Sequence, residues 1–125
     1  MTRPCLLALV PPVLAVALVS CGGDAPGQAA AQEACAAYAD TGRHQVATTV
    51  AGADAIRATA RKDARSAASA DPTWQALQRD IEDFYSRQAT LQTATVEGMD
   101  AYFAADRRVQ ADCVAAGRDI GPLKP

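Results

Sequence analysis

The 125-residue sequence is poor in the side chains on which most enzymes and nucleic-acid-binding proteins depend. It has one histidine, His44, and its 12 basic and 14 acidic side chains leave a formal charge of −2. Nucleic-acid binding usually needs a strongly basic face, so we expect no nucleic-acid partner. No Ser-His-Asp set can be assembled without His44, and one histidine is too few for a typical metal site. We therefore expect neither an enzymatic activity nor a cofactor.

Long apolar runs are also scarce, and the longest lies at the N-terminus. Arg3 precedes an apolar run from Cys5 to Val19 that only Pro11 and Pro12 interrupt. At 1.5 Å per residue, a helix of about 15 residues is shorter than the ~30 Å hydrocarbon core of a membrane. A basic start, an apolar middle and small residues before a cut are the parts of a secretory signal. We expect residues 1–20 to be a signal peptide and not a mature transmembrane helix.

Residues 18–21, Leu-Val-Ser-Cys, close this leader and resemble the lipobox of bacterial lipoproteins. The resemblance implies cleavage after Ser20, a diacylglycerol thioether on Cys21, and acylation of the new N-terminus with a fatty acid such as palmitate. Two or more acyl chains are what stable membrane attachment needs. The implied location is the extracytoplasmic face of the cell membrane, with Cys21 as the link to membrane lipid. In an organism with an outer membrane, Gly22 would not act as an inner-membrane retention signal.

Two cysteines remain for the mature domain. Cleavage removes 20 of 125 residues and one basic side chain, which leaves 105 residues with 11 basic and 14 acidic groups. Cys5 leaves with the leader and Cys21 carries lipid, so Cys35 and Cys113 are left. An extracytoplasmic compartment permits disulfides, and we predict a Cys35–Cys113 bridge. Closing a loop of about 78 residues is worth ~4 kcal/mol in the chain-entropy account, useful to a domain with few large apolar residues.

The mature chain is patterned as helix. Residues 21–28 form the lipidated cysteine and a flexible Gly/Pro-rich tether, residues 29–117 a helical domain, and residues 118–125 a flexible tail. Apolar and small residues recur every three or four positions, which keeps one face turned inward. The predicted inward positions are Cys35, Tyr38, Gly42, Val46, Val50, Ala53, Ile56, Ala60, Ala64, Ala67, Trp74, Leu77, Ile81, Phe84, Gln88, Leu91, Thr95, Gly98, Tyr102, Ala105, Val109 and Cys113.

The predicted bridge constrains the all-α fold. Cys35 lies near the start of the first helix and Cys113 near the end of the last, and those ends meet in an up-and-down bundle only when the helix count is even. Asp71 and Pro72 form the one strong break, as an N-cap and a first helical position. Two folds remain: a long antiparallel hairpin of helices 29–69 and 72–116, or a four-helix bundle with further breaks near Gly42 and Gly98. Alanine-rich seams modestly favour the hairpin.

Beyond the lipobox, the mature part loosely resembles small helical lipoproteins of actinobacteria. Cys35-Ala36-Ala37-Tyr38 and Cys113-Val114-Ala115-Ala116-Gly117 carry this resemblance, which implies no particular activity.

Three groups of side chains are candidate sites, and each has a simpler structural interpretation. His44 and Asp40 could pair on a helix, but two groups are too few for a metal ion, so we expect a solvent-exposed histidine. Basic residues repeat every four positions and could meet anionic lipid or an acidic polymer, but interspersed acids favour a solvated face. These residues are Arg57, Arg61 and Arg65, with Lys62, Asp54 and Asp63. Further mixed charges follow at Arg79, Asp80, Glu82, Asp83 and Arg87.

The aromatic residues could line a ligand groove, but helical spacing favours a core role. They are Trp74, Phe84, Tyr85, Tyr102 and Phe103, of which Tyr85 and Phe103 lie off the seam and should be partly exposed. The leading functional hypothesis is a lipid-anchored module that binds an envelope protein or has a structural role there. The alternative is a carrier or sensor for a small apolar ligand held between the helices.

Overall fold

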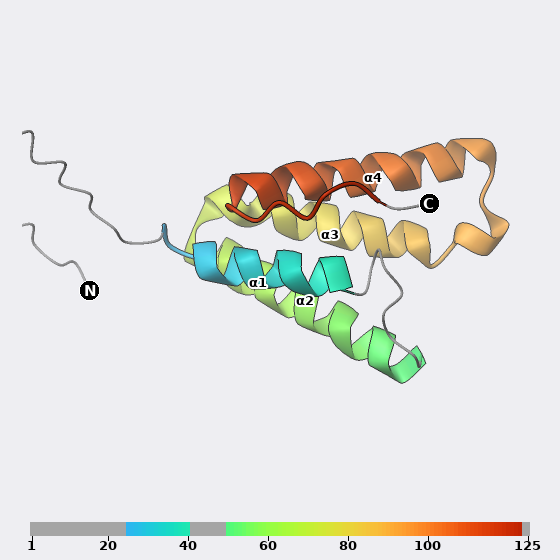
Figure 1. Ribbon diagram of the computed structural model, residues 1–125. Helices are drawn as coiled ribbons and strands as arrows, with labels where there is room; N and C mark the ends of the chain where they lie inside the picture. The colour runs from blue at the N-terminus through green and yellow to red at the C-terminus, as the bar shows by residue number, and fades with distance from the viewer. Residues whose placement is uncertain (1–24, 41–49, 124–125) are drawn as a thin grey trace, which may run out of the picture.

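The computed structural model describes residues 25–40 and 50–123, and within these ranges the chain is an up-and-down bundle of four α-helices (Figure 1). They are α1 (Gln28–Tyr38), α2 (Val50–Ala70), α3 (Gln75–Gln88) and α4 (Val96–Ala115). Short 3₁₀ turns at Pro72–Trp74 and Leu91–Thr93 precede α3 and α4. The predicted signal peptide, Cys21, Val46 and the expected break at Gly42 lie outside the described residues.

The predicted all-α fold is confirmed in its four-helix form, so the long hairpin favoured by the alanine seams is wrong. The second half of the chain is interrupted between α3 and α4, at 89–95, a few residues before the break expected near Gly98, which itself lies inside α4. The hydroxyls of Thr90 and Thr93 bond to backbone carbonyls three residues earlier. Thr95 then caps α4 by accepting a hydrogen bond from the Gly98 N–H at 3.2 Å. Several hydrogen bonds between hydroxyl and backbone groups therefore separate α3 from α4, whereas Asp71 and Pro72 alone separate α2 from α3.

The break at Asp71 and Pro72 is confirmed. The Asp71 carboxylate accepts a hydrogen bond from the Thr73 N–H at 2.8 Å, and Pro72 occupies the first position of the following 3₁₀ turn. Hydrogen bonds from the Thr73 side chain and then from its backbone hold the pKa of Asp71 below its ordinary value. The cap therefore turns the chain so that α3 runs antiparallel to α2.

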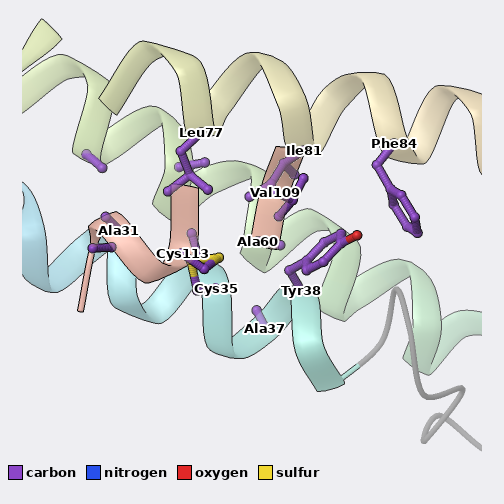
Figure 2. Packing of buried hydrophobic residues seen from close by; sticks show 14 of the residues in the cluster. Ala31, Cys35, Ala37, Tyr38, Ala60, Leu77, Ile81, Phe84, Val109 and Cys113 are labelled. Atoms are coloured by element: carbon purple, nitrogen blue, oxygen red, sulfur yellow. A yellow bond between two sulfur atoms is a disulfide. The ribbon is translucent and has the colours of Figure 1, made fainter. Parts of the chain in front are cut away.

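The core has a small-residue half and a large-residue half. Between α1 and α2, the buried residues are mostly alanines, which lets these two helices approach closely. Larger side chains from α3 and α4 fill the centre (Figure 2). The fully buried members include Ala31, Ala34, Cys35, Tyr38, Ala60, Ala64, Ala67, Ile81, Phe84, Ala105, Val109 and Cys113. Most of the predicted inward positions in the described ranges are therefore confirmed.

The predicted seam fails at the ends of the helices. Val50 was expected inside but is exposed, because α1 has 11 residues and α2 has 21, so α1 covers only the second half of α2. Thr95 is also exposed, since it caps α4 instead of continuing a helix. Periodicity identifies the inward face of a helix, but the length of the partner decides how much of that face is covered.

Residues within the expected tether and tail contact the bundle at both ends of the domain. At the N-terminal end, the indole N–H of Trp74 donates to the Pro26 carbonyl at 2.8 Å, so the chain is docked from Ala25 onward. At the C-terminal end, the chain turns at Gly117 and runs back along the bundle (Figure 1). Ile120 and Leu123 pack half-buried against the core. The tail is therefore part of the fold as far as Leu123.

Candidate functional site

The predicted Cys35–Cys113 disulfide is confirmed, and it joins the first helix to the last (Figure 2). The two Cα atoms are 5.7 Å apart and the half-cystines are fully buried. Close to the bridge, the Gln28 and Gln32 side chains donate to the Ala116 carbonyl at 3.3 and 2.9 Å. These two contacts satisfy a carbonyl at the end of α4, so the bridge and the C-terminal cap form one connection between α1 and α4.

A buried polar network that the sequence analysis missed lies beside the core. The Tyr38 hydroxyl donates to Oδ1 of Asp106 at 2.5 Å, and the Gln110 amide donates to Oδ2 of the same carboxylate. Asp106 is only 2% exposed. A carboxylate in this position is retained only when hydrogen bonds replace its water. The helical spacing of Asp106 indicates that it lies on the inward face of α4, since it follows Tyr102 by four residues and precedes Val109 by three.

Aromatic rings surround this network. The rings of Phe84 and Tyr38 have centroids 4.9 Å apart, and those of Phe84 and Tyr102 are 4.7 Å apart. The expectation that Tyr85 is partly exposed is wrong, because Tyr85 is buried against Phe84 with Arg61 5.1 Å above its ring. Phe103 is partly exposed, as expected. The aromatic residues thus serve mainly as core, and Phe103 alone of these five carries a large exposed fraction.

A second charged cluster joins α3 to α4. Asp80, expected on a mixed surface, is buried, and its Oδ1 lies 3.3 Å from Arg79 Nε and 3.4 Å from Arg108 Nε. Asp83 accepts from Arg87, four residues later on the same helix, at 2.9 Å, and from Arg108 at 2.6 Å. One arginine of α4 therefore bridges two carboxylates of α3.

Asp112 is the most perturbed group of this cluster. Burial and, next, repulsion from Asp80 raise the pKa of Asp112 to about 6, while Arg79 and Arg108 partly oppose the rise. Its Oδ2 atom is buried and accepts no hydrogen bond from the part of the chain that the structure describes. Asp112 directly precedes Cys113 in the sequence, and its carboxyl faces the charges of Asp80, Arg79 and Arg108.

The basic face of α2 is largely engaged within the bundle. Arg57 pairs with Asp54 at 3.0 Å and donates to Gln88 on α3 at 3.2 Å. Arg61 pairs with Glu82 on α3 at 2.8 Å. Lys62 and Arg65 are exposed. Arg57 and Arg61 thus connect α2 to α3. Lys62 and Arg65 form the solvent-exposed part of this basic face.

Two hollows on the surface of α2 and α3 are lined mainly by polar and charged groups. One, of about 240 Å³, is lined by Asp54, Arg57, Arg61, Tyr85, Gln88 and Ala89. The other, more open, is lined by Ala68, Ser69, Gln75, Gln78, Arg79 and Glu82. Their linings suit polar groups better than an apolar ligand.

The remaining sequence candidates give no additional site in the described ranges. Asp40 is exposed at the end of the first described segment, and His44 lies outside the described residues. Within residues 25–40 and 50–123, no group of three or more His, Cys, Asp or Glu side chains could hold a metal ion. In the same ranges, no helix combines the length and apolar character needed to cross a membrane.

Comparison with protein families, with curated proteins and with solved structures found no match to this chain.

Proposed function

We propose that this protein is a lipoprotein of the cell envelope, held at the extracytoplasmic face of the membrane through Cys21, whose helical domain binds another envelope protein. The lipobox resemblance of residues 18–21 supports the anchor. The proposed role is one of binding and not of catalysis.

An apolar line on the outer face of α4 carries the binding proposal. Val96, Phe103 and Val114 are 76%, 39% and 58% exposed. They are separated by 7 and 11 residues, and at 3.6 residues per turn such spacings fall within about 20° of one line along a helix. We call these three residues the α4 line. Together they give a partner protein exposed apolar area along one side of this helix.

Charged residues interrupt the α4 line, so a partner that covers this line would also contact them. Asp100 and Arg107 are exposed on the same helix, between the apolar positions. Protein interfaces commonly combine an apolar centre, enriched in aromatic residues and arginine, with a polar rim. Phe103 is the aromatic residue of the α4 line, so it is the residue that we expect to contribute most to binding.

The filling of the bundle centre favours this proposal over an apolar-ligand carrier. The space between the helices is occupied by side chains of the domain itself, including Tyr38, Leu77, Ile81, Phe84 and Val109 (Figure 2). A ligand between the helices would have to displace these close-packed groups, which costs the packing energy of the core. A partner on the α4 line displaces only water.

Site-specific photo-crosslinking in intact cells tests the proposal. The photoreactive analogue benzoyl-phenylalanine replaces Phe103 or Val114 on the α4 line, and Ser66, exposed on α2, as the control. We expect one protein adduct of the same mass from both α4 positions and none from position 66. Adducts that are absent on α4, or equal at all three positions, would overturn the binding proposal. An unmodified Cys21 in the intact mass of the membrane-fraction protein would overturn the anchor.

A further inference from the structure

The N-terminal segment is clamped against one end of the bundle. Trp74 Nε1–H donates to the Pro26 carbonyl at 2.8 Å, and the Ala25 N–H donates to the Gln28 side chain at 3.1 Å. Gly27 lies so close to α2 that a Cβ atom there would be 2.7 Å from the Ala67 carbonyl oxygen. The part of the chain that can act as a tether to an N-terminal anchor therefore ends at Ala25 and not at the start of α1.

Three segments meet at this end of the bundle. They are the start of α1, the 3₁₀ turn Pro72–Trp74 between α2 and α3, and the end of α4 at Ala116 (Figure 1). We call this the anchor end. The Leu91–Thr93 turn between α3 and α4 lies at the opposite, far end. The 20 residues of α4, at 1.5 Å each, separate the two ends by about 30 Å.

The chain between the proposed lipid and the clamp is short. Four steps connect Cys21 to Ala25, and at no more than ~3.6 Å per residue they span at most about 14 Å. That reach is about half the length of the bundle, so the bundle cannot stand upright on its far end, which would place Ala25 about 30 Å from the membrane.

We propose that the anchor end faces the lipid headgroup layer and that the Leu91–Thr93 turn points away from the membrane. This inference rests on the proposed lipidation of Cys21. Arg118, Asp71 and Asp119, all on segments at or next to the anchor end, sum to a single negative charge, which salt screens beyond about 8 Å at physiological ionic strength. In this orientation the α4 line stands upright, with Val114 nearest the membrane and Val96 farthest.

The orientation is tested with one probe placed either at the start of α3 or in the Leu91–Thr93 turn. Gln75 and Gln92 are both exposed glutamines, one at the anchor end and one at the far end. The full chain carries either Gln75→Cys or Gln92→Cys. Lipidation of Cys21 and the Cys35–Cys113 bridge leave the new thiol as the one available to a fluorescent maleimide. The purified lipoprotein is reconstituted into phosphatidylcholine–phosphatidylglycerol vesicles that contain a headgroup-labelled energy acceptor.

We expect several-fold stronger energy transfer from position 75 than from position 92. Equal transfer from both would mean that the domain lies along the membrane, for instance on Lys62 and Arg65 of α2, and would overturn the proposal. Inserting about ten Gly and Ser residues before Ala25 adds a flexible spacer of roughly 17 Å, and the two positions should then converge. A difference that survives the insertion would show that the tether does not set the orientation.

The intact mass of the same preparations separates this inference from the function on which it rests. An unmodified Cys21 would contradict the proposed lipid anchor. A lipidated Cys21 with equal energy transfer from both positions would contradict only the proposed orientation.

Discussion

The Tyr38 hydroxyl on α1 donates a hydrogen bond to the buried carboxylate of Asp106 on α4, so the first and last helices share a polar contact inside the core. Tyr38→Phe leaves this carboxylate with fewer donors, and we expect it to lower the free energy of unfolding by about 1–3 kcal/mol. Urea denaturation followed by circular dichroism measures the change. In a double-mutant cycle with Asp106→Asn, the coupling energy should be about 0.5–3 kcal/mol. Strictly additive losses would show that the two groups do not act together.

The disulfide should supply much of the stability of a domain with an alanine-rich core. Cys35 and Cys113 are 78 positions apart, and removal of a disulfide from a small secreted domain costs about 2–5 kcal/mol. We therefore expect reduction to lower the melting temperature, and non-reducing peptide mapping to recover one cross-linked peptide pair from this domain. The double variant Cys35→Ser/Cys113→Ser is the control, because reductant should not change its melting temperature. A reductant effect of equal size in that variant would assign the stabilisation to another cause.

The carboxyl of Asp112 should make stability depend on pH. Its pKa rises from 3.8 to about 6 on folding, so the folded state binds more protons between these values. The stability contributed by this group is fully present below about pH 3.8 and is lost as the pH rises through about 6. Asp112→Asn removes the titration and should therefore gain stability relative to the unsubstituted protein as the pH increases.

The expected gain is about 1–2 kcal/mol above neutral pH, since each pKa unit is worth ~1.4 kcal/mol and partial exposure of Asp112 reduces the effect. Urea midpoints collected across the acid-to-neutral range give the measurement. Asp100→Asn, an exposed carboxylate on the same helix, is the matched control. The assignment to Asp112 fails if both variants show the same pH dependence.

Substitution of Gly27, with Gly121 as the matched control, tests how tightly the N-terminal segment is held at the anchor end. Both have a positive φ, of 76° and 66°, but an added Cβ would meet the Ala67 oxygen only at Gly27, whereas nothing lies within 4 Å at Gly121. Each alanine substitution bears a backbone strain of about 1–3 kcal/mol. Gly27→Ala should also undock the segment from α2 and so cost more than Gly121→Ala. Equal losses in thermal denaturation would show that the clamp is loose.

The sequence predicted the repetitive part of this fold well and the local exceptions poorly. Leu77, Ile81 and Val109 recur at helical spacing, and burial of one helix face explains their position without further detail. The turn between α3 and α4 depends on weak hydroxyl contacts from Thr90, Thr93 and Thr95, whose sum is not apparent from any single residue.

The polar part of the candidate site was the hardest to predict. Asp80 and Asp106 look like surface residues because carboxylates are seldom buried. Both become acceptable inside because a second helix supplies donors: Arg108 to Asp80 across α3 and α4, and Tyr38 to Asp106 across α1 and α4. Such pairings depend on how the helices are placed against one another. The sequence pattern of one helix does not contain that information.

The long loop closed by the disulfide has a consequence for cleavage of the chain by proteases. A single cut anywhere between Cys35 and Cys113 would divide the polypeptide into two pieces that remain covalently joined. After a cut before Phe103, the C-terminal piece, which then includes Phe103 and Val114, would stay attached to the N-terminal segment. Release of this part from the cell surface would therefore require a cut between the anchor and Cys35, or a reductant together with the cut.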